Sequence, residues 1–512
     1  MFSQLMFVHT AFLRSFVLMP VVRDEGETKA LVYHNDMLMK KIIGDVEKFK
    51  DRNSLELTSQ RFRLLCLQTP ISRRKKYAIR LEADPNWPAV FTLLMRPRKY
   101  SSRLSIVTCS ADPEDKRQEL VSYRYKENKQ NAHEFYEGVR KRLLNQIVEF
   151  EIKFRRFTIG VLEEIQTFPN LNRIIVKNAR NFSAETDDEP EELVVLNRIT
   201  SLELTLDRQW SSEIARMKRL IGPNLKHFCC YVTPCQSKTQ WFIEEIMVEM
   251  AIHNVELDLC RLVFPDPQIP RILITALIQF MSERSRIMQV FVSTDSADII
   301  PMNNRAPAVG IQFRDEEDNT LKLLYDACPL IFQQAHTLRI SNLHDDNCDQ
   351  LDILPKLYAM RELQISCTSH KEELSPIDEL LLKIPSTVNT LTLNSCKLTS
   401  ASIDILVSST FETIQNLHLV QNGSCNTVQN FVKILEGFPN LKTLEMDMVI
   451  PHLMFPKIVE HSNLEKLTGF TNRSAPEKSL QILRNHFNHV CLKKVDRQNQ
   501  YLFLAKPIRS QL

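Results

Sequence analysis

Apolar residues recur along this chain in one short spacing. Three apolar positions, separated by two residues and then by one, appear repeatedly, for example at Val388, Leu391 and Leu393. The alternating part of this spacing predicts a short strand with one buried side. Helix-period segments such as "ASIDILVSSTF" and "NTVQNFVKILEGF" follow the strands. The pattern therefore predicts short strands that alternate with helices over most of the chain.

The strand pattern returns with a period of about 27 residues, which is within the range of stacked repeat units. "FPNL" ends at Leu171 and again at Leu441, and "GPNL" ends at Leu225. Leu441 lies ten periods after Leu171 and eight periods after Leu225, so the phase of the pattern is kept. Copies begin at Leu171, Ile199, Leu225, Ile252, Ile287, Ala308, Ala335, Met360, Val388, Ile414 and Leu441, with weaker ones at Ile147, Leu464 and Leu492.

This unit resembles the leucine-rich repeat, which reads L-x-x-L-x-L-x-x-N/C-x-L over roughly 20–29 residues. In "VNTLTLNSCKL" the N/C position is Cys396, and in "IQNLHLVQN" it is Asn422. The resemblance implies an α/β fold over residues 146–512: a solenoid of short parallel strands and helices whose stacked copies share one core. Ordinary α/β units without a common repeat are the alternative.

Every second residue of such a strand points away from the core. The outward positions carry polar side chains of both charge signs, which suits a protein partner and not a nucleic acid. A solvated face, with binding elsewhere, is the alternative. The candidate target-binding residues are Arg339, Gln364, Thr392, His418 and Glu445.

Two helical patterns near the start of the chain are apolar on more than one side. "DMLMKKII" places Leu38, Ile42 and Ile43 at helical spacing. In "DRNSLELTSQRFRLL", Leu55 and Phe62 share one side and Leu57 lies on another. Helices this short cannot bury two apolar sides by themselves. The second side is therefore predicted to be an interface.

The same segments resemble the F-box, a three-helix module whose second half reads D-R-x-x-L-x-L-x-x-x-R-F. The family usually opens on Leu-Pro, where this chain has His34-Asn35. The resemblance implies docking on a Skp-type adaptor and, through it, on the cullin and RING subunits of a ubiquitin ligase. A helical hairpin that caps the solenoid is the alternative. The residues implied for adaptor contact or internal packing are Leu38, Ile42, Ile43, Leu55, Leu57 and Phe62.

The expected organisation has four parts. Residues 1–30 form an N-terminal extension, 31–70 the F-box-like module, 71–145 a spacer or degenerate first repeats, and 146–512 the repeats. Within the spacer, "YAIRLEA", "LSIVTC" and "LVSYRY" alternate as strands do, and "NAHEFYEGVRKRLLNQI" has helical spacing.

Composition narrows the possible functions. The 512 residues include nine glycines, and the two nearest glycines, Gly423 and Gly437, are too far apart for a phosphate-binding loop. The twelve cysteines include no C-x-x-C pair, so the sequence shows no RING-type zinc site, and a reducing compartment is expected. The net charge of +3 gives no reason to expect nucleic acid or a membrane surface. The opening segment, up to Val22, carries Gln4, His9 and Arg14 and does not match a signal peptide.

The chain is thus expected to be a non-catalytic substrate receptor of a ubiquitin ligase in the cytoplasm or nucleus, with no cofactor and no metal. Its expected partners are the adaptor and a target protein. A protein-binding scaffold unconnected to ubiquitin is the first alternative. An enzyme with a diverged active site is the second, and no catalytic constellation in the sequence supports it.

Overall fold

The computed structural model divides into two compact units, one of residues 1–150 with 167–170 and one of residues 151–166 with 171–512. They are called the first and the second unit below. The structure describes residues 35, 39–40, 61–62, 65, 76–83, 101–109, 119–126, 129–153, 159–177, 196–206, 216–232, 236–265, 271–292, 305–313, 318–367, 377–409, 412–422, 427–472, 476–494 and 499–505.

The first unit contains a small antiparallel sheet. Strand β1 (Tyr77–Ala83) pairs with β2 (Ser101–Thr108), and β2 pairs with β3 (Glu119–Lys126). Helix α6 (Lys129–Leu143) follows, and β4 (Ile147–Lys153) spans the division between the units. The strands and the helix expected between residues 71 and 145 are present. Their antiparallel order is that of a small α/β arrangement and not of parallel repeats.

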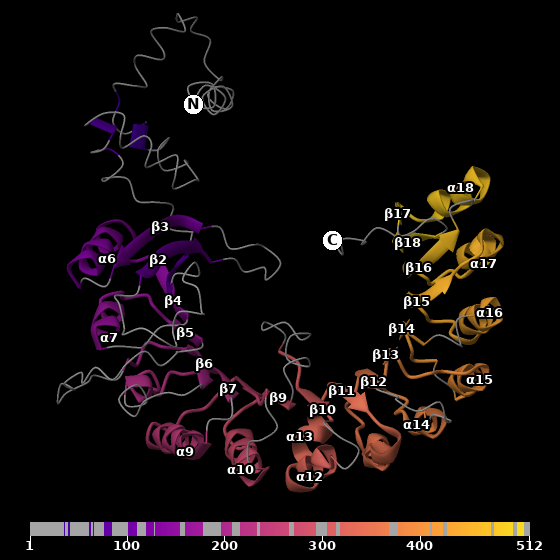
Figure 1. Ribbon diagram of the computed structural model, residues 1–512, viewed down its shortest axis with the longest axis horizontal. Coiled ribbons are helices and arrows are strands. Elements are labelled where there is room, and N and C mark those ends of the chain that lie inside the picture. Colours follow the sequence, from indigo (N-terminus) through magenta and orange to yellow (C-terminus); the bar gives the residue numbers. More distant parts are fainter. Residues whose placement is uncertain are drawn as a thin grey trace, which may run out of the picture. The chain divides into compact units, whose positions relative to one another are not determined.

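The second unit repeats a strand followed by a helical segment (Figure 1). Its parallel strands are β5 (Arg173–Lys177), β6 (Ser201–Leu206), β7 (His227–Val232), β8 (Leu259–Val263), β9 (Met288–Val292), β10 (Ala308–Gln312), β11 (Thr337–Leu343), β12 (Glu362–Cys367), β13 (Thr390–Asn394), β14 (Asn416–Val420), β15 (Thr443–Val449) and β16 (Lys466–Asn472). Among the described residues its helices are α7 (Ile159–Gln166), α9 (Gln236–Ile252), α10 (Arg271–Ser282), α12 (Thr320–Ala327), α13 (Pro329–Gln334), α14 (Ile377–Lys383), α15 (Ser400–Ser408), α16 (Val428–Gly437), α17 (Phe455–Glu460) and α18 (Glu477–His486), with 3-10 helices η2 (Asp345–Lys356) and η4 (His452–Met454).

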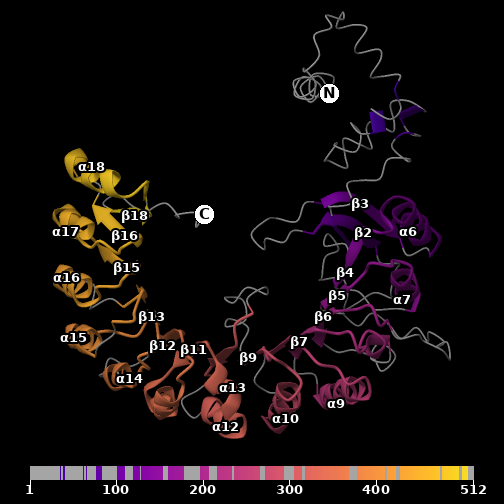
Figure 2. The ribbon, with the colours of Figure 1, turned by 180° about the vertical axis from the view of Figure 1, so that it is seen from behind.

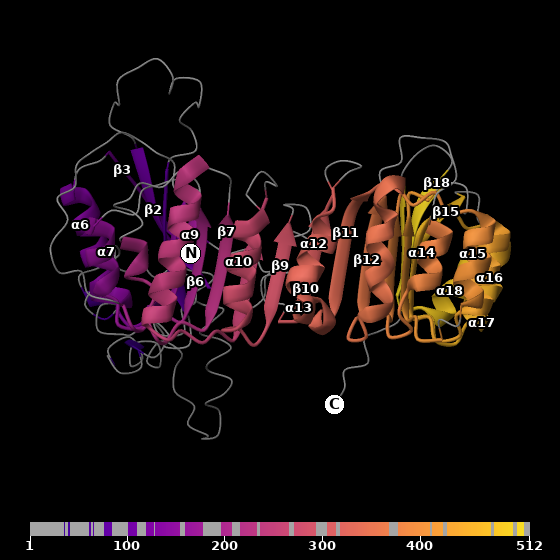
Figure 3. The same ribbon diagram turned by 90° about the horizontal axis from the view of Figure 1, so that it is seen from below.

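Within this unit the strands line one side and the helices the other, as the opposite views show (Figures 1 and 2). Seen from below, successive strands run side by side behind the helices (Figure 3). The shortest step between strand starts runs from Met288 to Ala308, and the longest runs from His227 to Leu259. The strands expected near Ile287 and Ala308 are both present. The predicted repetition of short strands and helices is confirmed. The copy predicted to begin at Ile252 is misplaced, because Ile252 is the last residue of α9 and the register places Cys260 and Leu262 of β8 beside Phe228 and Cys230.

A single buried row of leucines runs through the later repeats. The register pairs Leu338 with Leu363 and continues through the equivalent leucine of each following strand. All six are fully buried, so each repeat covers the apolar side of the next. The row is Leu338, Leu363, Leu391, Leu417, Leu444 and Leu467.

The helices begin at equivalent positions in consecutive repeats because the same residue type caps them. The Thr399 hydroxyl accepts a hydrogen bond from the N–H of Ser402 at the start of α15. The Thr427 hydroxyl does the same with the N–H of Asn430 at the start of α16. A threonine at this position satisfies one of the free N–H groups of a helix start.

The residues at the N/C position link the end of one strand to the end of the next by hydrogen bonds. The Asn422 side chain is buried; its Oδ1 accepts from the N–H of Cys396, and its Nδ2 donates to the carbonyl of Leu393, both at 2.8 Å. The preceding residues, Ser395 and Gln421, both have a φ of 54°. The same left-handed turn, which costs a non-glycine residue about 1–2 kcal/mol, is therefore held in both repeats.

The last predicted repeat strand, beginning at Leu492, is part of a different element. Strand β17 (His489–Lys494) pairs antiparallel with β18 (Asn499–Ala505), and β18 pairs antiparallel with β16. Because β18 lies between β16 and β17, the parallel order stops at β16. The prediction of a repeat strand at Leu492 is therefore wrong, because its apolar spacing belongs to this β17–β18 hairpin.

Replacing Asn422 with alanine should destabilise the second unit. The change leaves the N–H of Cys396 without its partner in the core, at about 1–3 kcal/mol, and removes the bond from the side chain to the carbonyl of Leu393. Thermal and urea unfolding of the purified chain would measure the loss. The matched control is Asn463→Ala, whose exposed amide makes one bond, to the carbonyl of Pro439. Equal effects of both changes would contradict the structural role of Asn422.

Candidate protein-binding face

The five predicted target-binding residues occupy one row across five neighbouring strands. The register pairs Arg339 of β11 with Gln364 of β12 and continues through Thr392 and His418 to Glu445 of β15. These positions alternate with the buried leucines, so the side chains lie on the side away from the core. This row is called the central row below. The sequence predicts the five on one face, and the structure brings them into a continuous line.

Arg339 is the most buried member of the central row. Its side chain is 9% exposed, and Nη2 donates to Oε1 of Glu362 at 3.0 Å. Its Nε and Nη1 are buried without a hydrogen-bond partner. Burial lowers the pKa of Arg339, and the carboxylate of Glu362 opposes that effect in part. A buried donor without a partner costs about 1–3 kcal/mol, so this guanidinium weakens the fold that holds it.

The other end of the central row carries a hydrogen-bonded pair of titratable side chains. Nδ1 of His418 lies 2.8 Å from Oε2 of Glu445. The hydrogen bond from His418 lowers the pKa of Glu445, and partial burial of the carboxyl opposes the shift. The charges of His418 and Lys466 lower this pKa further. Glu445 is therefore ionised at neutral pH and fixed in position by its neighbour.

The strand face of β6 to β9 differs from the polar face that the sequence predicts. Glu203 of β6 is only 2% exposed, and its carboxylate lies 2.9 Å from Nζ of Lys177 and 3.6 Å from Nη2 of Arg173. Further along, the face becomes apolar and buried at Val263 and Phe291. The strand face is therefore more closed at β8 and β9 than at β11 and the strands after it.

Sequence reasoning missed a buried polar pair next to this apolar patch. Arg261 is 2% exposed, and its Nε donates to Oε1 of Gln289 at 2.7 Å. Nε2 of Gln289 donates in turn to the carbonyl of Ala306. Both residues occupy the outward positions of "LCRLV" and "MQVFV". The alternation in these strands could have paired them once their register was known.

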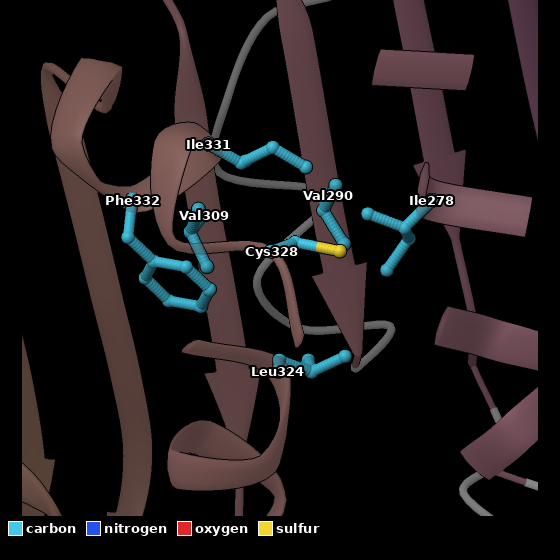
Figure 4. Close-up of a pocket in the computed structure, with 7 residues that line it drawn as sticks. All are labelled: Ile278, Val290, Val309, Leu324, Cys328, Ile331 and Phe332. Carbon is cyan, nitrogen blue, oxygen red and sulfur yellow. The ribbon is translucent and has the colours of Figure 1, made fainter. Parts of the chain in front are cut away.

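A small apolar cavity lies between the strands β9 and β10 and the helices α10, α12 and α13 (Figure 4). It has room for about one water molecule. Its one polar lining group is the thiol of Cys328, whose pKa is raised by burial. A cavity of this size and chemistry does not fit an organic cofactor. Its lining residues are Ile278, Val290, Val309, Leu324, Cys328, Ile331 and Phe332.

Among the described residues, no cluster of three or more His, Cys, Asp or Glu side chains is placed to hold a metal ion. None of the helices in the described part combines the length and apolar character needed to cross a membrane.

Most of the residues implied for adaptor contact lie outside the described residues. They are Leu38, Ile42, Ile43, Leu55 and Leu57. Phe62 is described; it is helical and partly buried, and nearby Leu65 is buried. The N–H of Met39 donates to the carbonyl of Asn35 at 2.9 Å, which is a helical turn. The adaptor site stays a prediction.

Comparison with known proteins adds no family assignment. The chain matches no protein-family model, and no curated protein is significantly similar to it.

The His418–Glu445 pair should give stability that depends on pH. Because the pKa of Glu445 is lowered in the folded state, its contribution is present above the ordinary carboxyl value of about 4.3 and is lost as pH falls through the lowered value. His418→Ala should therefore lower the unfolding midpoint at pH 7, and the difference from the unchanged chain should shrink below about pH 4. Thermal unfolding from pH 7 to pH 3 measures this, with His452→Ala as control. A difference that is as large at pH 3 as at pH 7 would contradict it.

Replacing Arg339 with methionine should leave stability within about 1 kcal/mol of the unchanged chain or raise it. The change removes two unpaired buried donors, and Glu362, with a third of its side chain exposed, returns to water. Urea unfolding measures the effect, with Arg361→Met as the exposed control. A loss well above about 3 kcal/mol would mean that the Arg339–Glu362 pair holds the face together.

Proposed function

We propose that this chain is a substrate-recognition subunit of a Skp-adaptor, cullin and F-box type ubiquitin ligase. The helices near its start bind the adaptor, and the strand face of β11 to β15 binds a target protein. The observation that carries the proposal is the central row, a continuous line of polar side chains on a repeat array that follows an F-box-like sequence.

The leucine-rich repeat part of the proposal is supported by three agreeing features. The strands pair in parallel with equivalent leucines in register, as in "LTL" of β13 and "LHL" of β14. Both N/C residues, Cys396 and Asn422, are buried, and the backbone N–H of Cys396 donates a hydrogen bond to the side chain of Asn422. The strand exits before them use the same left-handed turn. Repeats of this kind place their binding residues on the strand side.

The chemistry of the central row favours a protein as the bound molecule. It carries a cation at one end, Arg339, and an anion at the other, Glu445, with uncharged polar groups and His418 between them. Neither sign dominates, whereas a phosphate backbone would require an excess of cations. Mixed polar groups on a partly open surface are typical of protein interfaces.

The mechanism we propose is proximity. The adaptor side and the target side belong to one chain, so the ligase's transfer subunits meet the target at a high effective concentration. The chain itself performs no bond-making step. The free energy of target binding is used to position lysines of the target.

The second candidate function is a protein-binding scaffold with no link to ubiquitin. It is favoured by the His34-Asn35 dipeptide, which replaces the Leu-Pro that usually opens an F-box. Proline presets the first turn of a helix, so its loss removes part of that preorganisation.

Binding of the purified full-length chain to a purified Skp-type adaptor tests the proposal. The double change Leu38→Asp with Ile42→Asp should weaken binding at least tenfold, because each aspartate would place a charge in an apolar interface. The matched control is Leu453→Asp, since this leucine is 77% exposed in the second unit. Calorimetry or a pull-down measures the affinity.

An intact, folded chain that does not bind the adaptor at micromolar concentration would overturn the ligase function and leave the scaffold. Equal loss of binding in the Leu38/Ile42 pair and in the Leu453 control would show a general effect of added charge, and the implied interface would be wrong.

A further inference from the structure

The β17–β18 hairpin extends the strand face beyond β16. Residues directly paired in antiparallel strands point to the same side of the sheet. The register therefore sets Phe470 of β16 beside Tyr501 of β18, and Tyr501 beside Lys493 of β17. On the other flank, Val449 of β15 pairs with Phe470. A row of three apolar or aromatic residues thus ends in a lysine.

Two further rows lie beside this one. Phe503 pairs with Thr468 and with Cys491, and Ala505 pairs with Lys466 and with His489. The alternate residues of β16 and β18, such as Leu467, Leu502 and Leu504, are fully buried on the core side. The aromatic rings therefore lie on the side away from the core. The hairpin face is defined here as Val449, Lys466, Phe470, Lys493, Tyr501 and Phe503.

The aromatic rings of the hairpin face contact neighbouring rings and are partly exposed to solvent. Phe470 and Tyr501 meet edge to face with their centroids 6.2 Å apart. Phe503 meets His489 in the same way at 5.5 Å. All three aromatic residues are partly exposed, and Val449 is 42% exposed. Rigid aromatic side chains left partly open are typical anchors of protein interfaces.

Two lysines supply the positive charge of the hairpin face. Lys466 and Lys493 are both exposed, and neither forms an ion pair with a carboxylate of the described residues. Nζ of Lys466 lies 5.6 Å from the centroid of the Phe503 ring. The nearest carboxylates on β15 have partners already: Glu445 pairs with His418, and Asp447 accepts from the N–H of Gln421.

We propose that the hairpin face binds a short segment of a partner protein in which carboxylates flank an aromatic or proline side chain. The apolar side chain packs on Phe470 and Tyr501, and the carboxylates pair with Lys466 and Lys493. The identification of this segment as part of a ubiquitination target rests on the proposed function. The chemistry of binding is argued from the hairpin face alone.

A nucleic acid fits this face less well, although bases also stack on exposed aromatic rings. Two lysines neutralise few phosphates, so the electrostatic part of the affinity would be small. A short acidic peptide needs only the two cations that are present.

Selection from a random twelve-residue peptide library displayed on phage, with the full-length chain as bait, tests the inference. The enriched peptides should combine Asp or Glu with an aromatic residue or proline. In fluorescence anisotropy, the double reversal Lys466→Glu with Lys493→Glu should weaken the best peptide at least tenfold. The matched control reverses two exposed lysines of the helical side, Lys457→Glu with Lys478→Glu, and should leave the affinity unchanged.

A charge swap separates direct pairing from a folding effect. The selected peptide with its acidic residues changed to lysine should bind the Lys466/Lys493 reversal more tightly than it binds the unchanged chain. Four outcomes would overturn the inference: no enrichment of acidic peptides, equal loss in both reversals, no response to the charge swap, or tighter binding of a twelve-residue oligouridylate than of any peptide.

Adaptor binding is measured on the same samples. If the unchanged chain binds the peptide but not the adaptor, the proposed function fails and the hairpin face stands. If adaptor binding is kept and peptide binding is absent, the hairpin face fails alone.

Discussion

The second unit depends on apolar contact between each repeat and its neighbours. A strand and a helix of this length cannot bury their shared apolar side alone, so the leucine row from Leu338 to Leu467 is stable only as a stack. Burial of one leucine side chain contributes about 1.5–3 kcal/mol, and every repeat adds the same term. The buried amide of Asn422 links the end of β14 to the end of β13. Because the stack holds the backbone, the outward side chains carry little of the folding free energy.

Because the stacked leucines hold the backbone, the strand face can carry polar side chains that contribute little to folding. Arg339 keeps two buried donors without partners, and His418 and Glu445 are fixed by each other and not by the core. The unpaired donors of Arg339 are unfavourable for stability, and the retention of such groups is typical of binding surfaces. The strand face of β6 to β9 uses its outward positions differently, with Val263 and Phe291 buried and Arg261 bonded to Gln289. The strand face of the second unit therefore has buried outward positions in one part and partly exposed ones in another.

The repetition and most of the strand positions could be predicted from the sequence because each repeat obeys a local rule; the strand predicted at Ile252 is misplaced, since β8 begins at Leu259. Alternation predicts β9 and β10 correctly, and the outward residues from Arg339 to Glu445 fall into one row. The hairpin could not be predicted this way. An apolar spacing such as that at Leu492 looks the same in a parallel and in an antiparallel strand, and only pairing over long range decides between them. The side to which Phe470, Tyr501 and Phe503 point follows from that pairing.

The hairpin also determines how the array ends. A parallel stack presents an unpaired strand edge at each end, and such an edge can recruit another copy and grow into a fibre. Here β18 occupies the open edge of β16, and β17 is a short strand that carries the exposed Lys493. Charged residues on a short outermost strand oppose edge-to-edge association. The antiparallel hairpin therefore covers the parallel edge of β16, and a second copy of the array cannot pair with that edge.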